Sequence, residues 1–176
     1  MSNEMSEEMK RFIGLSAVLT GFSKSILAPG IDPVDIKSDY LPFFRKKLAE
    51  EFKDSDLFDT LLSTFSDLSA KGLTDTQIGQ QLLNNDNGDF VTACRKLIFM
   101  WYSGAWPTII SARDGQPEST VSTLISAKSY TQGLVWQVMQ SHPMGSSNYR
   151  YGYWAKVPPE LSAYTGHDNQ TQGAKQ

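Results

Sequence analysis

The stretch "DFVTACRKLIFMWYSGAWP", Asp89–Pro107, lies in the middle of the chain and holds two of its four tryptophans. Its apolar residues recur every three or four positions, which is the spacing of one helix face. They are Phe90, Cys94, Leu97, Ile98 and Trp101. We predict a helix with Asp89 as its N-cap, ended by Gly104 and Pro107. The aromatic end of this helix belongs either to a core or to a surface that another protein covers.

Helical spacing continues on both sides of this stretch. Asp32–Pro33 is typical of an N-cap followed by a first-turn proline, and Pro42 should kink or split the helix that follows. Thr74 or Asp75 should start another helix after a glycine stop. The clearest amphipathic pattern runs from Leu57 to Leu68. Including the central one, the predicted helices cover residues 6–27, 33–52, 57–68, 75–83, 89–104 and 127–140.

Alternation typical of strands is nearly absent, apart from Tyr149, Tyr151 and Tyr153 near the C-terminus. Residues 111–120 are polar and predict an exposed loop. We therefore expect an all-α fold, a single domain of five or six helices with a long irregular aromatic C-terminal arm. The domain with its arm should span residues 1–160, and residues 161–176 should form a disordered tail.

Composition limits the classes of function. The chain has 176 residues, 40% of them hydrophobic and 11% aromatic, which is enough for one domain with a real core. A net charge of −3 without a dense basic surface argues against nucleic acid as the main partner. The apolar runs fall short of the roughly 18 residues that a spanning helix needs, so no direct membrane insertion is predicted. Cys94, the single cysteine, is predicted to be a buried, unreactive thiol.

Few residues suit catalysis. His142 precedes a proline at a predicted helix end, where it suits the helix C-terminus, and His167 lies in the polar tail. The sequence contains no glycine-rich phosphate loop and no nucleophile elbow. We predict that the chain has no catalytic, cofactor-binding or metal-binding residues of its own.

Aromatic residues are concentrated in the second half of the chain, where all four tryptophans lie. Tryptophan and tyrosine are enriched at the centres of protein interfaces. An irregular segment buries such side chains only when it lies against a surface, either of a partner or of its own helices. The predicted partner interface comprises Trp101, Tyr102, Gly104, Trp106, Trp136, His142, Pro143, Tyr149, Tyr151, Tyr153, Trp154, Pro158 and Pro159.

Several segments follow one another in an order typical of a known family. They are "FIGLSAVLTGF" (12–22), Asp32–Pro33, "LIFMWYSGAW" (97–106), "YTQGLVWQVM" (130–139) and "YGYWAKVPP" (151–159). As an ordered set they resemble the small (gamma) subunit of membrane-associated FAD-dependent sugar and polyol dehydrogenases. This family includes the small subunits of the sorbitol, fructose and glucose dehydrogenase complexes. The resemblance runs from about residue 12 to residue 160.

The resemblance implies a division of labour between subunits. The large subunit is a flavoprotein of the glucose–methanol–choline type that binds FAD and oxidises a sugar or alcohol hydroxyl. A cytochrome c subunit, when present, passes the electrons on. The small subunit carries no cofactor, binds the large subunit and supports its folding and maturation, and in many members its export by the twin-arginine route.

The same resemblance implies a location in the periplasm, attached to the inner membrane through partners. This sequence departs from the family pattern, because Lys10–Arg11 is not a twin-arginine motif and no apolar leader follows it. Either a leader has been removed, or the chain is exported on the signal of a partner, or it stays in the cytoplasm, which is the alternative location. Two other functions stay open: a free-standing helical adaptor that binds an unrelated protein, and an enzyme in its own right.

Overall fold

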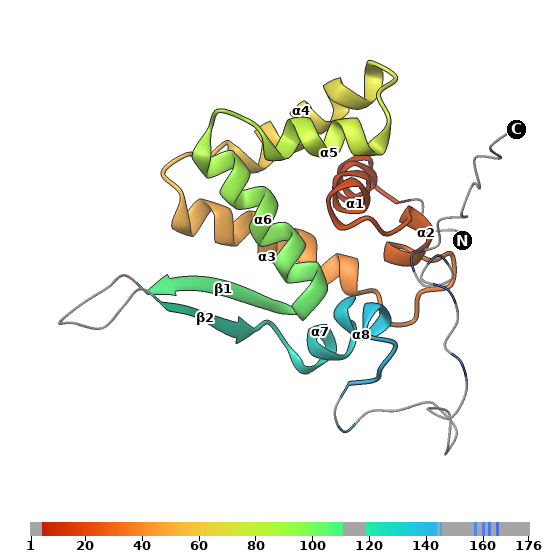
Figure 1. The fold of residues 1–176 in the computed structure, drawn as a ribbon. Coiled ribbons are helices and arrows are strands. Elements are labelled where there is room, and N and C mark those ends of the chain that lie inside the picture. The colour runs from red at the N-terminus through yellow and green to blue at the C-terminus, as the bar shows by residue number, and fades with distance from the viewer. Residues whose placement is uncertain are drawn as a thin grey trace, which may run out of the picture.

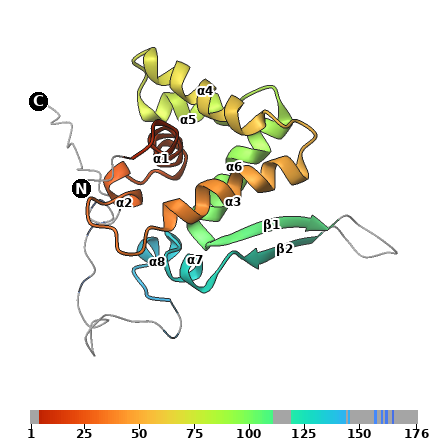
Figure 2. The same ribbon diagram turned by 180° about the vertical axis from the view of Figure 1, so that it is seen from behind.

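The computed structural model describes residues 5–110 and 119–143, together with residues 145, 157, 160, 162 and 165. Helices form most of it, and two strands extend from the end of α6 on the side away from α1 and α2 (Figures 1 and 2). The elements are α1 (Glu7–Thr20), α2 (Lys24–Leu27), α3 (Ile36–Glu51), α4 (Leu57–Ala70), α5 (Asp75–Leu83), α6 (Gly88–Ser103), β1 (Ala105–Ile110), β2 (Ser119–Leu124), α7 (Ala127–Thr131) and α8 (Val135–Val138).

The prediction of an all-α fold is wrong, because β1 and β2 pair as a two-stranded antiparallel sheet. The pairing runs from Ala105 opposite Leu124 to Ile110 opposite Ser119. Pro107 indicated a helix end, yet it lies inside β1, as proline can in an edge strand. All six residues of β2 are exposed, so the strand has no buried face, and its apolar residues, Val121 and Leu124, do not alternate with polar ones. Ser119 and Thr120, predicted in a loop, belong to β2, and residues 111–118 lie outside the described residues.

The first predicted helix is divided. Ser6 caps α1, with its hydroxyl oxygen accepting a hydrogen bond from the Met9 amide at 3.2 Å. Gly21 then adopts a left-handed conformation (φ 74°), and its amide bonds back to the carbonyl of Ala17. A glycine in this conformation ends a helix without the steric cost of a side chain. The prediction of one helix over 6–27 is therefore wrong, and α2 is a separate short turn.

The start of α3 also differs from the prediction. Asp35, not Asp32, occupies the N-cap position, with φ 51°. The Asp32 carboxylate instead accepts a hydrogen bond from the Asp35 amide at 2.7 Å and pairs with Lys37 at 2.7 Å. Pro42 lies within α3 but does not divide it into two helices. Asp32, which was predicted to cap the helix, instead stabilises the loop before α3.

The predicted helix over residues 127–140 is two short helices, α7 and α8. Gly133 separates them, and a Cβ atom there would lie 2.8 Å from the Tyr102 carbonyl oxygen. The next amide, of Leu134, donates to the Trp101 carbonyl at 3.0 Å. The chain is interrupted here because its backbone packs directly against the end of α6.

The remaining helices agree closely with their predictions. α4 is confirmed, and α5 begins at a capping box in which Thr74 and Gln77 bond reciprocally. α6 is confirmed, although its N-cap is Asn87 rather than Asp89, and it ends at Gly104. These helices pack around α1, whose Phe12 ring lies 6.2 Å from Phe44 and 6.4 Å from Trp101.

Candidate partner interface

Trp101, predicted at the interface, lies in the core. It is 1% exposed, and its indole Nε1 donates a hydrogen bond to the Ser16 hydroxyl at 2.9 Å. The Tyr40 ring meets it edge-on, with 4.9 Å between ring centroids. In this conformation the side chain offers no surface to a partner, so its part in the predicted interface is corrected to core packing.

Trp106 is buried as well, at 3% exposed. Its ring meets Phe43 and Phe44 edge-on, at 5.8 and 6.0 Å, and its indole Nε1 donates to the Glu51 carboxylate. The Lys96 ammonium lies 4.9 Å from the ring centroid, within cation–π range. This tryptophan fixes the base of β1 to the helices and is likewise removed from the predicted contact surface.

Lys96 and Glu51 complete a small polar cluster around Trp106. The ammonium pairs with the Glu51 carboxylate and donates to the Pro107 carbonyl at 3.1 Å. Its side chain is only 10% exposed, and that of Glu51 is 28% exposed. The cluster joins the end of α3, the middle of α6 and the start of β1. A mostly buried charge is tolerated here because each polar atom has a partner.

Gly104 is needed for backbone geometry. It adopts φ 68°, and a Cβ atom there would lie 2.1 Å from the Ser129 carbonyl oxygen. Its own carbonyl accepts hydrogen bonds from the Ser129 hydroxyl at 2.7 Å and from the Ile125 amide at 3.1 Å. Gly104 was predicted to lie at the partner interface, but the segment that approaches it closely is the chain's own α7.

Tyr102 and Trp136 are half-buried, so each retains surface that a partner could contact. The Tyr102 hydroxyl donates to the Thr20 carbonyl at 2.9 Å, and burial raises its pKa. The Trp136 indole donates to the Tyr130 carbonyl at 2.7 Å, with the two rings edge-on at 5.2 Å. Both polar groups are satisfied internally, so only ring surface is available for binding.

His142 and Pro143 follow α8 and are also half-buried, and the His142 Nδ1 lies 3.1 Å from the Pro143 carbonyl oxygen. The other predicted interface residues, Tyr149, Tyr151, Tyr153, Trp154, Pro158 and Pro159, lie outside the described residues. Val157, between Trp154 and Pro158, is described and is 93% exposed. Further along, the Thr165 carbonyl accepts a hydrogen bond from the Ser23 amide at 2.8 Å. The chain thus returns to its own α1–α2 connection at Thr165.

The sequence did not reveal the exposed apolar side chains of the hairpin formed by β1 and β2. Ile109 is 56% exposed, Val121 46% and Leu124 53%. Val138 and Met139, at the end of α8, are also exposed. Residues opposite one another in a sheet share a face, so Ile109 and Leu124 point to one side and Val121 to the other. These residues could have been identified from the sequence only if the two strands had been predicted first.

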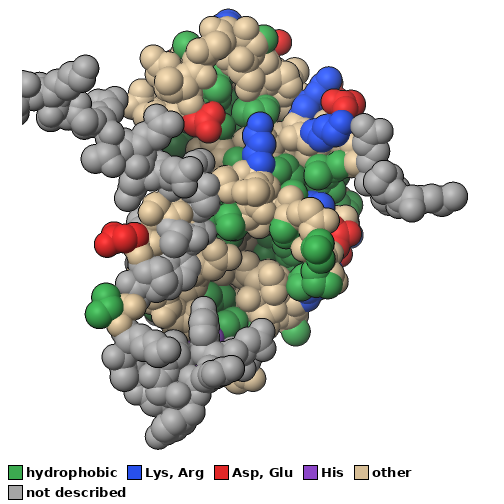
Figure 3. Space-filling view, turned by 90° about the vertical axis from the view of Figure 1, so that its right-hand side faces the viewer, with side chains coloured by type: hydrophobic (Ala, Val, Ile, Leu, Met, Phe, Trp, Pro, Cys, Tyr) green, Lys and Arg blue, Asp and Glu red, His purple; other side chains and the backbone are tan. Residues whose placement is uncertain are grey.

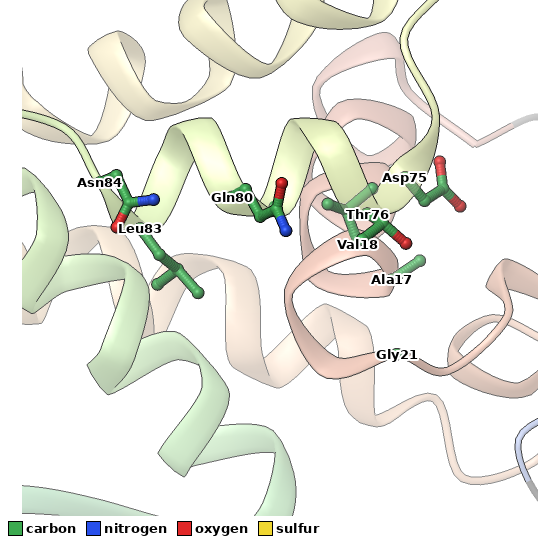
Figure 4. A pocket seen from close by; sticks show the side chains of 9 residues that line it. Ala17, Val18, Gly21, Asp75, Thr76, Gln80, Leu83 and Asn84 are labelled. Carbon is green, nitrogen blue, oxygen red and sulfur yellow. The ribbon is translucent and has the colours of Figure 1, made fainter.

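Other surfaces are less distinctive. A groove between α1 and α5, with Val18, Gln80 and Leu83 in its walls, mixes polar and apolar side chains and contains no residue of the predicted interface (Figure 4). On the face seen in Figure 3, hydrophobic side chains occur among polar and charged ones. Within residues 5–110 and 119–143 and the five isolated positions, no three potential ligands gather to hold a metal ion.

Cys94 has no exposed surface, which confirms the predicted buried thiol. Burial raises the pKa of this thiol to about 12, far from the range in which thiolates react at neutral pH. In the part of the chain that the structure describes, no helix combines the length and apolar character required to cross a bilayer.

Comparison with known proteins adds no relative: no family model, no curated protein and no solved structure matches this chain.

Proposed function

We propose that this chain is the non-catalytic small subunit of a FAD-dependent sugar or alcohol dehydrogenase. It binds a large catalytic subunit of the glucose–methanol–choline type and supports the folding and maturation of that subunit. FAD and the reacting groups belong to the large subunit, and a cytochrome c subunit is an optional third component. The observation that carries the proposal is the ordered set of segments between residues 12 and 160 that resembles this family.

The proposal places the assembled complex in the periplasm, attached to the inner membrane through its partners and exported together with the large subunit. Location in the cytoplasm is the alternative. Fractionation of cells that express the chain at natural levels would decide between the two compartments.

Exposed apolar surface supports a binding role. Ile109, Leu124 and Met139 are each more than half exposed. Burying apolar surface contributes about 25 cal/mol per Å², so an interface of roughly 800 Å² per partner would offset the cost of association. In the revised interface, Trp101, Gly104 and Trp106 are buried and make no contact with the partner. Its contacting residues are Tyr102, Trp136, His142, Pro143 and the aromatic segment that follows them.

Co-expression with the neighbouring gene product tests the proposal. The chain and a large flavoprotein should elute together in size exclusion, and their shared peak should show flavin absorption. Sugar oxidation with an artificial electron acceptor should require the flavoprotein and be absent from this chain alone. Turnover by the purified chain would contradict the assignment, and stable capture of a protein without flavin would favour the free-standing adaptor.

A further inference from the structure

The two outer edges of the hairpin are chemically different. The Ile125 amide donates to the Gly104 carbonyl at 3.1 Å, one position beyond the pairing of Ala105 with Leu124. In an antiparallel pair, hydrogen-bonded and non-hydrogen-bonded positions alternate along the strands. The position of Pro107 opposite Ser122 is therefore non-hydrogen-bonded, and the backbone groups of both residues point away from the partner strand.

The outer edge of β1 is closed to another strand. Pro107 has no amide hydrogen to donate. Its carbonyl, which points outward, already accepts a hydrogen bond from Lys96. β1 also lies on the side of α3 and α6, whereas β2 lies on the side away from them (Figures 1 and 2). A partner strand therefore cannot extend the sheet on this side.

Among the described residues, none pairs with the outer edge of β2. By the same alternation, the backbone N–H and C=O groups of Thr120 and Ser122 point outward. Within the described ranges no hydrogen bond reaches these two residues from outside the sheet, and every residue of β2 is exposed. Its sequence, "STVSTL", contains no charge and no proline. Charged side chains and prolines are the features that ordinarily protect an exposed edge from pairing.

We infer that the outer edge of β2 binds an extended, uncharged strand of the large flavoprotein subunit, which adds a third strand to the sheet. This inference rests on the proposed function and names the part of the small subunit that makes the contact. Unpaired N–H and C=O groups in a row are matched only by another extended backbone. The apolar side chains beside this edge, Leu124 and Ile109 on one face and Val121 on the other, favour β-branched or apolar residues in the added strand.

A large partner fits this edge better than a second copy of the chain does. Six strand residues span about 20 Å, so edge pairing alone buries far less than the roughly 800 Å² per partner of a stable interface. Two hairpins joined edge to edge would form one wider sheet. Ile109 and Leu124 project from a face of that sheet, so they would remain exposed to solvent. A large subunit can supply both the strand and a surface that covers these side chains.

The test uses Ser122→Pro with Ser122→Ala as its matched control. Proline at 122 removes an outward amide hydrogen without removing a bond between β1 and β2, and alanine retains that hydrogen. Wild type and each variant are co-expressed in full length with an affinity-tagged large subunit, and their ratio in the captured complex is measured by mass spectrometry. We expect Ser122→Pro to be depleted about tenfold or more and Ser122→Ala to match wild type.

Each outcome is decisive. Equal capture of wild type and Ser122→Pro would overturn the strand inference and leave the proposed function standing. If wild type captures no flavoprotein, the proposed function fails and the inference fails with it. If Ser122→Pro does not fold, amide hydrogen exchange of the wild-type chain replaces it. In the complex the Thr120 and Ser122 amides should gain at least about tenfold protection relative to the free chain, and no gain would overturn the inference.

Discussion

At the scale of single residues, Tyr40 shows how much a satisfied polar group matters. Its side chain is fully buried against Trp101, and within the described chain its hydroxyl has no hydrogen-bond partner. Burial raises the pKa of this phenol well above its usual range, so it stays neutral. An unpartnered buried hydroxyl costs about 1–3 kcal/mol of desolvation that the folded state does not recover.

Replacing Tyr40 with phenylalanine should therefore raise the free energy of unfolding, by about 1 kcal/mol. The control is Tyr102→Phe, which removes a hydroxyl that donates to the Thr20 carbonyl at 2.9 Å. That variant should lower the free energy of unfolding by about 0.5–1.5 kcal/mol. Urea unfolding followed by circular dichroism measures both. Destabilisation by Tyr40→Phe would mean that the hydroxyl has a partner, such as a buried water.

Gly104 and Gly21 separate backbone strain from steric overlap. Both have positive φ, but a Cβ at Gly104 meets the Ser129 carbonyl oxygen at 2.1 Å, whereas a Cβ at Gly21 meets nothing within 4 Å. Gly21→Ala should cost about 1 kcal/mol of stability, which is the left-handed penalty alone. Gly104→Ala should cost clearly more, because α7 must move as well. Thermal unfolding compares the two variants, and equal costs would contradict the close approach of α7.

Cys94 predicts a pH effect with a defined sign. Its folded-state pKa is raised to about 12 by burial, while a thiol in the unfolded chain ionises near pH 8.5. Above that pH the unfolded state loses a proton that the folded state keeps, so stability falls as pH rises toward 12. Cys94→Ala should remove this part of the slope, and the difference between the two chains isolates it from other groups. Identical slopes for the two chains between pH 8 and 10 would contradict the buried thiol.

At the scale of elements, the Lys96–Glu51–Trp106 cluster holds the hairpin to the helices. Glu51→Gln keeps an oxygen for the Trp106 indole but leaves the mostly buried Lys96 ammonium without its counter-charge. We expect a loss of about 2–3 kcal/mol, below the full cost for a wholly buried pair because Glu51 is partly exposed. Glu50→Gln, next to it but in an exposed pair with Lys47, should leave stability unchanged.

Urea unfolding measures the two glutamate variants. The chain has four tryptophans, so the Trp106 signal is obtained as the difference in fluorescence between each chain and its Trp106→Phe counterpart, and it reports on the base of the hairpin. A red shift in Glu51→Gln alone would locate the damage at this cluster. If Glu51→Gln and Glu50→Gln behave alike, the cluster does not anchor the hairpin.

Elements with a strong period were predictable from sequence, and elements without one were not. α4, α5 and α6 follow from amphipathic runs with recognisable stops and caps. The strands were missed because Pro107 imitates a helix end and β2 has no buried face. The division of α7 from α8 depends on the contact of Gly133 with Tyr102. This is a tertiary contact with the end of α6, so it cannot be predicted from the local sequence.

The candidate interface was predicted less well than the helices. Tryptophan is enriched both in cores and at interfaces, so its presence in the sequence did not distinguish Trp101 and Trp106, which are buried, from Trp136, which is half exposed. Ile109 and Leu124 are far apart in the sequence, and only the pairing of the two strands shows that they lie on the same face of the sheet.

At the scale of the whole molecule, the proposed function predicts that the aromatic segment can be altered without loss of the helical body. Tyr151→Ala with Trp154→Ala should weaken co-purification with the large subunit and leave the helical circular dichroism nearly intact, because the described core is built from residues before 135. Trp101→Ala is the contrasting variant. It removes a fully buried ring and should cost about 3–5 kcal/mol of stability. Collapse of the helical signal in the double variant would place those rings in the chain's own core.

The hydrogen bond between Gly104 and Ile125 closes the hairpin where the chain leaves and re-enters the helical body. Because strand side chains alternate, one residue inserted into β1 beyond Trp106 would turn Ile109 to the opposite face. Two residues inserted into each strand would instead preserve every orientation and carry the tip outward by about 6.6 Å. The distance by which the hairpin extends from the helices can thus be changed in steps of two residues per strand. The helices themselves need not change.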